Sequence, residues 1–260
     1  MTLIHHIWTR GLKAYRQQPT FPATRGYCDC ANWEHAPGHR MPGVTTITDQ
    51  MDKSGPLMYW AVNQALDNLR KRRGSLLMEA HLQEAKQMPA RVRDAAADWG
   101  TQAHDAISRY FLTREQALKL GEYGVAVSAA ERWAEEQGLA LDMHERAVLH
   151  PELRYAGTFD AMGDHGPAGH HRLAIVDWKT GKSLYAEMAI QVAAYAKAYE
   201  AQHGVTVNEA WVVRLPKQAP TGKQKPFEAR RVADLDGAFE VFEALLATWR
   251  FMKQQGGIWK

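Results

Sequence analysis

The sequence predicts an α/β fold in which helices flank a central mixed β-sheet, with a helical part preceding that sheet. Three observations support this fold class. Helical segments fill residues 53–138, strand-like segments follow after Gly138, and residues 172–178 (Arg-Leu-Ala-Ile-Val-Asp-Trp) form a run that is apolar on both faces. Such a strand is typical of the centre of a sheet that is covered by helices on both sides. Helices followed by the order βββαββα indicate one mixed sheet.

The composition is that of a globular protein. The chain has 260 residues, of which 45% are hydrophobic and 23% charged, enough for one large domain or two small ones. No apolar run approaches the roughly 20 residues that span a bilayer, so we exclude a transmembrane protein. With only Cys28 and Cys30 and no secretory pattern at the N-terminus, we expect a reducing cytoplasm. The net charge of +3 is too small to indicate nucleic-acid binding by itself.

Proline and glycine punctuate the first part of the chain, which predicts an extended, loop-rich arm over residues 1–52. One domain then covers residues 53–260, with a helical part over 53–138 and a sheet core over 139–260. Apolar spacing and end signals predict helices in the helical part over residues 55–72, 75–87, 90–112 and 122–137. We place the break between the second and third of these helices at Pro89, because proline removes a helix hydrogen bond.

The sheet core begins after Gly138, which is suited to closing the last of these helices. A hairpin is expected first, with strands over 139–149 and 153–162 around a Pro151-Glu152 turn. The remaining predicted elements are the central strand 172–178, a helix over 185–203, strands over 207–214 and 226–232, and a final amphipathic helix over 236–254.

The end of the central strand carries candidate chemistry. Side chains alternate along a strand, so Asp177 and Lys179 point to one face and Trp178 to the other. Taken alone, such a pair is most often a structural ion pair. However, Asp160 ends the preceding predicted strand, and Glu145 lies on the strand before that. Two ionised carboxylates brought close together repel unless a cation lies between them.

Hard oxygen ligands in this number suit Mg²⁺ or Mn²⁺ rather than zinc. A lysine beside such a metal can orient or deprotonate an attacking water. The residues therefore favour a metal-assisted hydrolytic site.

Four segments in a fixed order carry a family resemblance. They are Gly100-Thr101-Gln102-Ala103-His104, Gly157-Thr158-Phe159-Asp160, Ile175 to Lys182 with its Asp-Trp-Lys, and Gln191 to Tyr195 with its Gln-x-x-x-Tyr spacing. Together they resemble the PD-(D/E)XK nucleases, and more narrowly their RecB-like exonuclease branch. Pro42 to Ile47, followed by Leu57, Trp60 and Ala61, is similar to the N-terminal part of phage-type members. Phe159 stands where the family name has proline, which leaves the aspartate in place.

The resemblance implies a restriction-endonuclease-like core and a Mg²⁺- or Mn²⁺-dependent deoxyribonuclease, most simply an exonuclease. It implies that the residues at or near the chemistry are Asp160, Asp177, Lys179, Gln191 and Tyr195. It implies metal ligation by His104, Asp160 and Asp177, with Glu145 as a further ligand. The expected nucleic-acid contacts are Arg70, Lys71, Arg72, Arg73 and Lys182.

The expected substrate is DNA, single-stranded or with duplex ends, and the expected partners are recombination or replication proteins. The implied setting is recombination, repair or phage DNA processing in the cytoplasm of a bacterial or phage-infected cell.

Several alternatives stay open at this stage. The chain can be a non-catalytic nucleic-acid-binding or assembly protein that retains the nuclease fold, or a metal-dependent phosphoesterase for small molecules. The basic run Arg70–Arg73 can be a solvated helix end. Cys28, Cys30, His35 and His39 have residue types that bind zinc, although the single residue between the cysteines is tighter than usual, and they can equally be free side chains in a loop.

Overall fold

A computed structural model describes residues 27–28, 40–51, 54–72, 74, 78–114, 117–165, 172–222 and 225–253. The chain forms two compact units. One contains Met1–Gln50 together with His104–Lys260, and the other contains Met51–Ala103. The first unit holds the whole sheet, and each unit is described below by itself.

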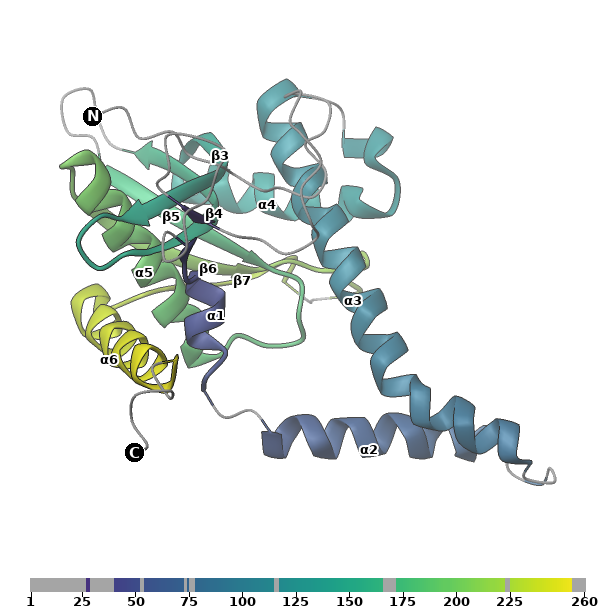
Figure 1. Ribbon diagram of the computed structural model, residues 1–260. Coiled ribbons are helices and arrows are strands. Elements are labelled where there is room, and N and C mark those ends of the chain that lie inside the picture. The colour runs from purple at the N-terminus through teal and green to yellow at the C-terminus, as the bar shows by residue number, and fades with distance from the viewer. Residues whose placement is uncertain are drawn as a thin grey trace, which may run out of the picture. The chain divides into compact units, whose positions relative to one another are not determined.

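A five-stranded mixed sheet forms the centre of the first unit (Figure 1). Its strands, in spatial order, are β3 (Ala140–His150), β4 (Tyr155–His165), β5 (Arg172–Lys179), β6 (Val207–Arg214) and β7 (Glu228–Arg231). All neighbouring strands are antiparallel except β5 and β6, which are parallel. The predicted α/β class and the central mixed sheet are therefore confirmed.

Helix α5 (Ala186–His203) makes the crossover that the parallel strands β5 and β6 require. It packs against the sheet, and α6 (Leu235–Lys253) packs on α5. Short helix α1 (Val44–Thr48) joins this layer, and the Gln50 side chain donates a hydrogen bond to the Leu245 carbonyl of α6 at 3.0 Å. Part of the predicted arm is thereby fixed to the body of the first unit.

A second helical layer is formed by α4 (Gly124–Gln137), which follows a 3₁₀ segment (Ala117–Tyr123). The buried Trp133 indole of α4 packs edge-on against Trp178 of β5 and Trp211 of β6, at 5.4 and 5.7 Å between ring centroids. Gly138 closes α4 with a left-handed backbone, φ 65°, as its position predicts. A small two-stranded sheet, β1 (Tyr27–Cys28) with β2 (Arg40–Met41), also belongs to the first unit, as does the last part of helix α3, from His104 on.

The second unit is built from α2 (Ser54–Arg70) and the first part of α3 (Glu79–Thr113). The predicted break at Pro89 is wrong, because α3 continues through it. A proline costs a helix one backbone hydrogen bond, and strong helix formers on both sides of Pro89 carry the helix past it. Glu84 of α3 joins the two helices, since it accepts hydrogen bonds from Asn68 and Arg72.

Among the described residues, no helix is both long and apolar enough to cross a bilayer.

One close contact fixes α5 against β4. A Cβ atom built on Gly157 of β4 would lie 2.4 Å from Cε1 of Tyr195 on α5 and 3.0 Å from Cγ2 of Val44 on α1. Only a residue without a side chain leaves room for the tyrosine ring there. Gly157 therefore sets the position of Tyr195.

We predict that Gly157→Ala lowers the free energy of unfolding by about 1–3 kcal/mol, because the added methyl overpacks this contact. Urea unfolding monitored by circular dichroism measures the change. Gly181→Ala is the matched control, since a Cβ at Gly181 meets open space. Equal losses in both variants would show that the Tyr195 contact is not the cause.

Candidate active site

Asp160 and Asp177 face each other across two strands. The paired residues of β4 and β5 run from His165–Arg172 to Ala161–Val176. One further step in this register places Asp160 opposite Asp177. There the Asp160 side chain replaces the backbone as hydrogen-bond acceptor, and its Oδ2 accepts a hydrogen bond from the backbone N–H of Trp178 at 2.7 Å. Asp160 was expected at the end of its strand, whereas β4 continues to His165, so the carboxylate lies inside the sheet.

Glu145 lies beside the same point on β3, in an unusual backbone conformation. Its φ is +48°, in the left-handed region that non-glycine residues rarely adopt. Opposite Glu145, the side chains of β4 no longer alternate regularly between the two faces of the sheet. Phe159 packs on Tyr199 of α5, and Met162 pairs with Met143, whose sulfur contacts the same tyrosine at 3.7 Å. Residues three apart in an ideal strand face opposite sides, so the sheet is distorted where the acids meet.

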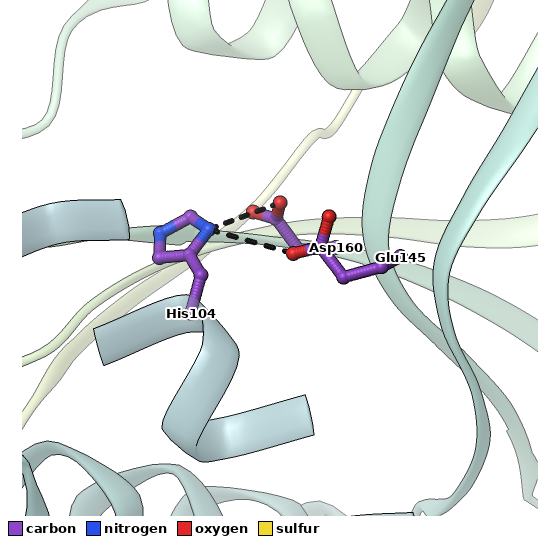
Figure 2. A group of neighbouring side chains, drawn as sticks. All are labelled: His104, Glu145 and Asp160. Carbon is purple, nitrogen blue, oxygen red and sulfur yellow. Dashed lines mark hydrogen bonds and ion pairs between the residues drawn. The ribbon is translucent and has the colours of Figure 1, made fainter. Parts of the chain in front are cut away.

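His104 of α3 completes a cluster with the two acids. Its Nδ1 lies 3.2 Å from Oδ1 of Asp160 and 3.9 Å from Oε1 of Glu145. Figure 2 shows the imidazole facing both carboxylates. One ligand atom from each of the three residues lies within 4.8 Å of the others. The side chains are largely buried, with 23% exposure for His104 and 12% for each acid.

This donor set fits a divalent cation. Two carboxylates and one imidazole suit Mg²⁺ or Mn²⁺, both of which take oxygen ligands, and Mn²⁺ in particular accepts imidazole. Such ions keep several positions for water or substrate, and the cluster supplies only part of a coordination shell.

The charges in this cluster are strongly coupled. Burial by itself would lower the pKa of His104, but the neighbouring Asp160, Glu145 and Asp177 outweigh burial and raise that pKa to about 9. Burial would raise the pKa of Asp160, but His104 and Lys179 reverse the effect and lower it. Burial raises the pKa of Asp177 to about 6, with a further contribution from Asp160. The positive charges of His104 and Lys179 thus offset part of the repulsion between these acids.

A hydrogen-bonded chain runs from Asp177 to helix α5. Lys179 Nζ lies 2.6 Å from Oδ2 of Asp177 and donates a hydrogen bond to Oε1 of Gln191 at 3.1 Å. Gln191 Nε2 in turn donates to the Tyr195 hydroxyl at 2.9 Å. Burial would lower the pKa of Lys179, but Asp177 and Asp160 outweigh burial and raise it. Lys179 is therefore a positively charged donor here rather than a base.

The predicted nucleic-acid contacts fall in different places. Arg70 and Arg72 lie in the second unit, where they pair with Asp67 and Glu84, respectively. Lys71 is exposed there as well, and Lys182 is exposed in the first unit on the segment between β5 and α5.

Two predictions fall partly outside the described residues. Arg73 lies outside them, and so do Cys30, His35 and His39 of the candidate zinc string. Only the backbone of Cys28 is described, in β1.

The left-handed backbone conformation at Glu145 was not predicted from the sequence. The one available signal was the polar run His144-Glu145-Arg146, which interrupts the apolar alternation of the predicted strand after Leu141 and Met143. That interruption marks the place where β3 is distorted.

Comparison with known proteins identifies the family of the chain. Residues 64–257 match the family model described as the PD-(D/E)XK nuclease superfamily. No curated protein matches the chain. Solved structures similar to the chain include an alkaline exonuclease (LHK-Exo) from Laribacter hongkongensis, at 13% identity over 83% of this chain and 93% of that chain, with a TM-score of 0.34. LHK-Exo in complex with dAMP has the same identity and coverage, with a TM-score of 0.28.

Both TM-scores are low, so the assignment depends on the family model. That match spans well over half of the chain, and the chain therefore belongs to the PD-(D/E)XK nuclease superfamily.

Proposed function

We propose that this protein is a DNA nuclease that hydrolyses phosphodiester bonds with the help of Mg²⁺ or Mn²⁺. One observation carries the proposal. The buried Asp177 and the half-buried Lys179, 2.6 Å apart, stand beside the His104, Glu145 and Asp160 cluster, whose ligand atoms lie within 4.8 Å of one another. Phosphodiester hydrolysis needs a metal ion to activate water and a positive charge to stabilise the transition state. A cluster that can bind a metal, next to a fixed lysine ammonium, can supply both.

His104, Glu145 and Asp160 would hold the metal, with Asp177 as a further ligand opposite Asp160. When bound, the ion would polarise the scissile phosphate and lower the pKa of the attacking water. The chain's own residues supply the rest. Asp160 is fixed through its bond to the Trp178 N–H, so its free oxygen keeps one direction toward His104.

Lys179 supplies positive charge at the point where negative charge develops on the phosphate. Its ammonium is held between Asp177 and Gln191, and Gln191 is held by Tyr195. A donor held in advance needs little reorganisation as charge develops, which makes its electrostatic effect large. Gln191 and Tyr195 are thus positioning residues for Lys179.

We extend the proposal to exonuclease activity in recombination, repair or phage DNA processing. Support for this extension comes from the RecB-like motif set, namely Gly100 to His104 on the upstream helix and Gln191 to Tyr195 on the helix after Lys179. The extension also covers DNA ends as the substrate and Arg70, Lys71, Arg72, Arg73 and Lys182 as contacts to it.

Cleavage of end-labelled DNA tests the proposal. Single- and double-stranded substrates, linear and covalently closed circular, are incubated with Mg²⁺, Mn²⁺ or EDTA. We expect metal-dependent degradation of linear DNA and survival of the circles. Cleavage of circles would refute the exonuclease extension, and absence of metal-dependent cleavage on every substrate would refute the nuclease proposal.

We predict that Lys179→Met lowers the cleavage rate by about 10²- to 10³-fold, because removing one prepositioned donor at a developing charge has an effect of this size. Lys197→Met is the matched control. Both lysine side chains are 22% exposed, and Lys197 also has a carboxylate at 2.6 Å, from Asp236. Single-turnover cleavage assays should show near-normal activity in the control, and equal activity in the two variants would contradict the role of Lys179.

We predict that Mn²⁺ affinity increases with pH, because the metal must displace the proton of His104. With a pKa of about 9, His104 is protonated at neutral pH, and an imidazolium cannot bind a metal. Apparent affinity should therefore rise by up to about tenfold per pH unit below that pKa. Calorimetric titration between neutral and mildly alkaline pH measures this slope. His104→Gln should bind Mn²⁺ more weakly and with a flatter pH dependence, and equal slopes would contradict ligation by His104.

We also predict a pH-dependent stability difference between the wild type and Asp177→Asn in metal-free buffer. The folded-state pKa of Asp177 is raised to about 6 from its ordinary value of 3.8. The folded state therefore binds the proton more tightly, and its advantage is lost as the pH rises from about 4 to 6. The wild type should lose up to about 3 kcal/mol relative to the variant over this range. A constant difference in urea unfolding energies across the range would contradict the raised pKa.

A further inference from the structure

A cavity of about 670 Å³ lies on the α4 side of the sheet, apart from the acidic cluster. Its aromatic wall is formed by Trp133 of α4, Trp211 of β6 and Phe227, which directly precedes β7. Trp211 and Phe227 are only half-buried, so part of each ring is accessible. The Trp211 indole N–H donates to Glu209 at 2.9 Å, which fixes the orientation of the ring. The cavity thus has a preformed aromatic surface.

The cavity and the candidate active site both lie at the ends of strands β5 and β6. Arg214, which lines the cavity, pairs with Lys179 in the parallel β5–β6 ladder. The Leu215 backbone N–H also donates to the Lys179 carbonyl at 2.7 Å. Lys179 bonds to Gln191 on the α5 side, whereas its neighbour Trp178 contacts the α4 side. The tryptophan wall of the cavity and the reactive side chains therefore lie on opposite faces of the sheet, and Arg214 lines the cavity where β6 ends.

The charge of the cavity wall favours an anion. Arg214 and Lys225 line it, and Glu228 is its acidic lining residue. Glu228 accepts hydrogen bonds from Arg214 at 3.0 Å and Arg230 at 2.9 Å, so its charge is offset. Lys225 is exposed beside the aromatic wall. An aromatic surface bordered by cations has the chemistry that unpaired nucleotides bind, since bases stack and phosphates pair with cations.

We propose that this cavity binds an unpaired nucleotide of the substrate strand, with the base against Trp211 and Phe227 and the phosphate beside Arg214 and Lys225. This inference rests on the proposed nuclease function and adds a binding subsite to it. The cavity volume lies within the range of small-molecule sites, so a nucleotide fits. Stacking is tolerant of base identity, so the subsite holds any strand without reading its sequence.

Binding in EDTA tests the subsite apart from cleavage. The probe is a fluorescent single-stranded oligonucleotide about ten nucleotides long, and its anisotropy gives the dissociation constant. Phe227→Ala should weaken binding about tenfold, as loss of one stacking partner does. Phe227→Leu keeps most of the apolar volume but lacks the ring, and should weaken binding similarly. Phe251→Ala, a change at an exposed phenylalanine of α6, should leave binding unchanged.

Two further measurements separate stacking from charge. An abasic position moved along the oligonucleotide should weaken wild-type binding at one site, and Phe227→Ala should no longer respond to it. Lys225→Ala should reduce the slope of log affinity against log salt by about 0.7, the value for one phosphate contact on a single strand. Among the described residues of the same loop, Lys217 is an exposed lysine outside the cavity lining, and Lys217→Ala is the control.

The outcomes distinguish the two proposals. If the wild type cleaves DNA with metal but Phe227→Ala and Lys225→Ala bind like their controls, the subsite is refuted and the nuclease proposal stands. If the wild type neither binds nor cleaves any DNA, the nuclease proposal falls and the subsite with it.

Discussion

The candidate site depends on one hydrogen bond, in which the Asp160 carboxylate replaces a backbone carbonyl as the acceptor between two strands. By accepting the Trp178 N–H at 2.7 Å, it satisfies a buried backbone donor at the point where regular pairing of β4 and β5 stops. The strands can separate there without an orphaned amide. Glu145 of β3 has its left-handed backbone at the same level. His104 meets the two acids there.

Burial makes this arrangement costly unless each acid has its own counter-charge. Asp160 has His104 at 3.2 Å, and Asp177 has Lys179 at 2.6 Å. The two pairs differ in their proposed use. A bound metal would replace the proton of His104, so the first pair would be exchanged for metal ligation. Lys179 remains a fixed charge because Gln191 holds it from α5. The Asp160–His104 pair would thus be replaced by metal ligation, whereas the Asp177–Lys179 pair would remain. The acids would then have counter-charges both before and after a metal binds.

The sequence predicted the fold well because its strongest signals are local. The apolar run over 172–178 predicted the central strand, and Gly138 predicted the end of α4, since both depend on neighbouring residues alone. The continuity of α3 through Pro89 was missed, because one lost hydrogen bond is small against the helix formers on both sides.

The candidate site was less accessible to prediction from sequence. Face alternation gave the common direction of Asp177 and Lys179, and the strand order gave the closeness of Asp160. The left-handed backbone of Glu145 could not be predicted, because residues other than glycine rarely adopt it and no local motif calls for it. The cavity lined by Trp133 and Trp211 was also missed, since α4 and β7 are far apart in the sequence and both line it only in the folded chain.

The paired ends of β5 and β6 connect the two faces of the sheet. Asp177 and Lys179 point toward α5, and the intervening Trp178 packs against Trp133 on the other side. The pairing of β5 with β6 extends beyond the strands through the Leu215 N–H and the Lys179 carbonyl. A base stacked on Trp211 would therefore be held by a strand that is paired with the strand of Lys179. On our proposals, a DNA strand that passes over the ends of β5 and β6 would stack on one face of the sheet and be cleaved on the other. The stacking would not depend on the base sequence.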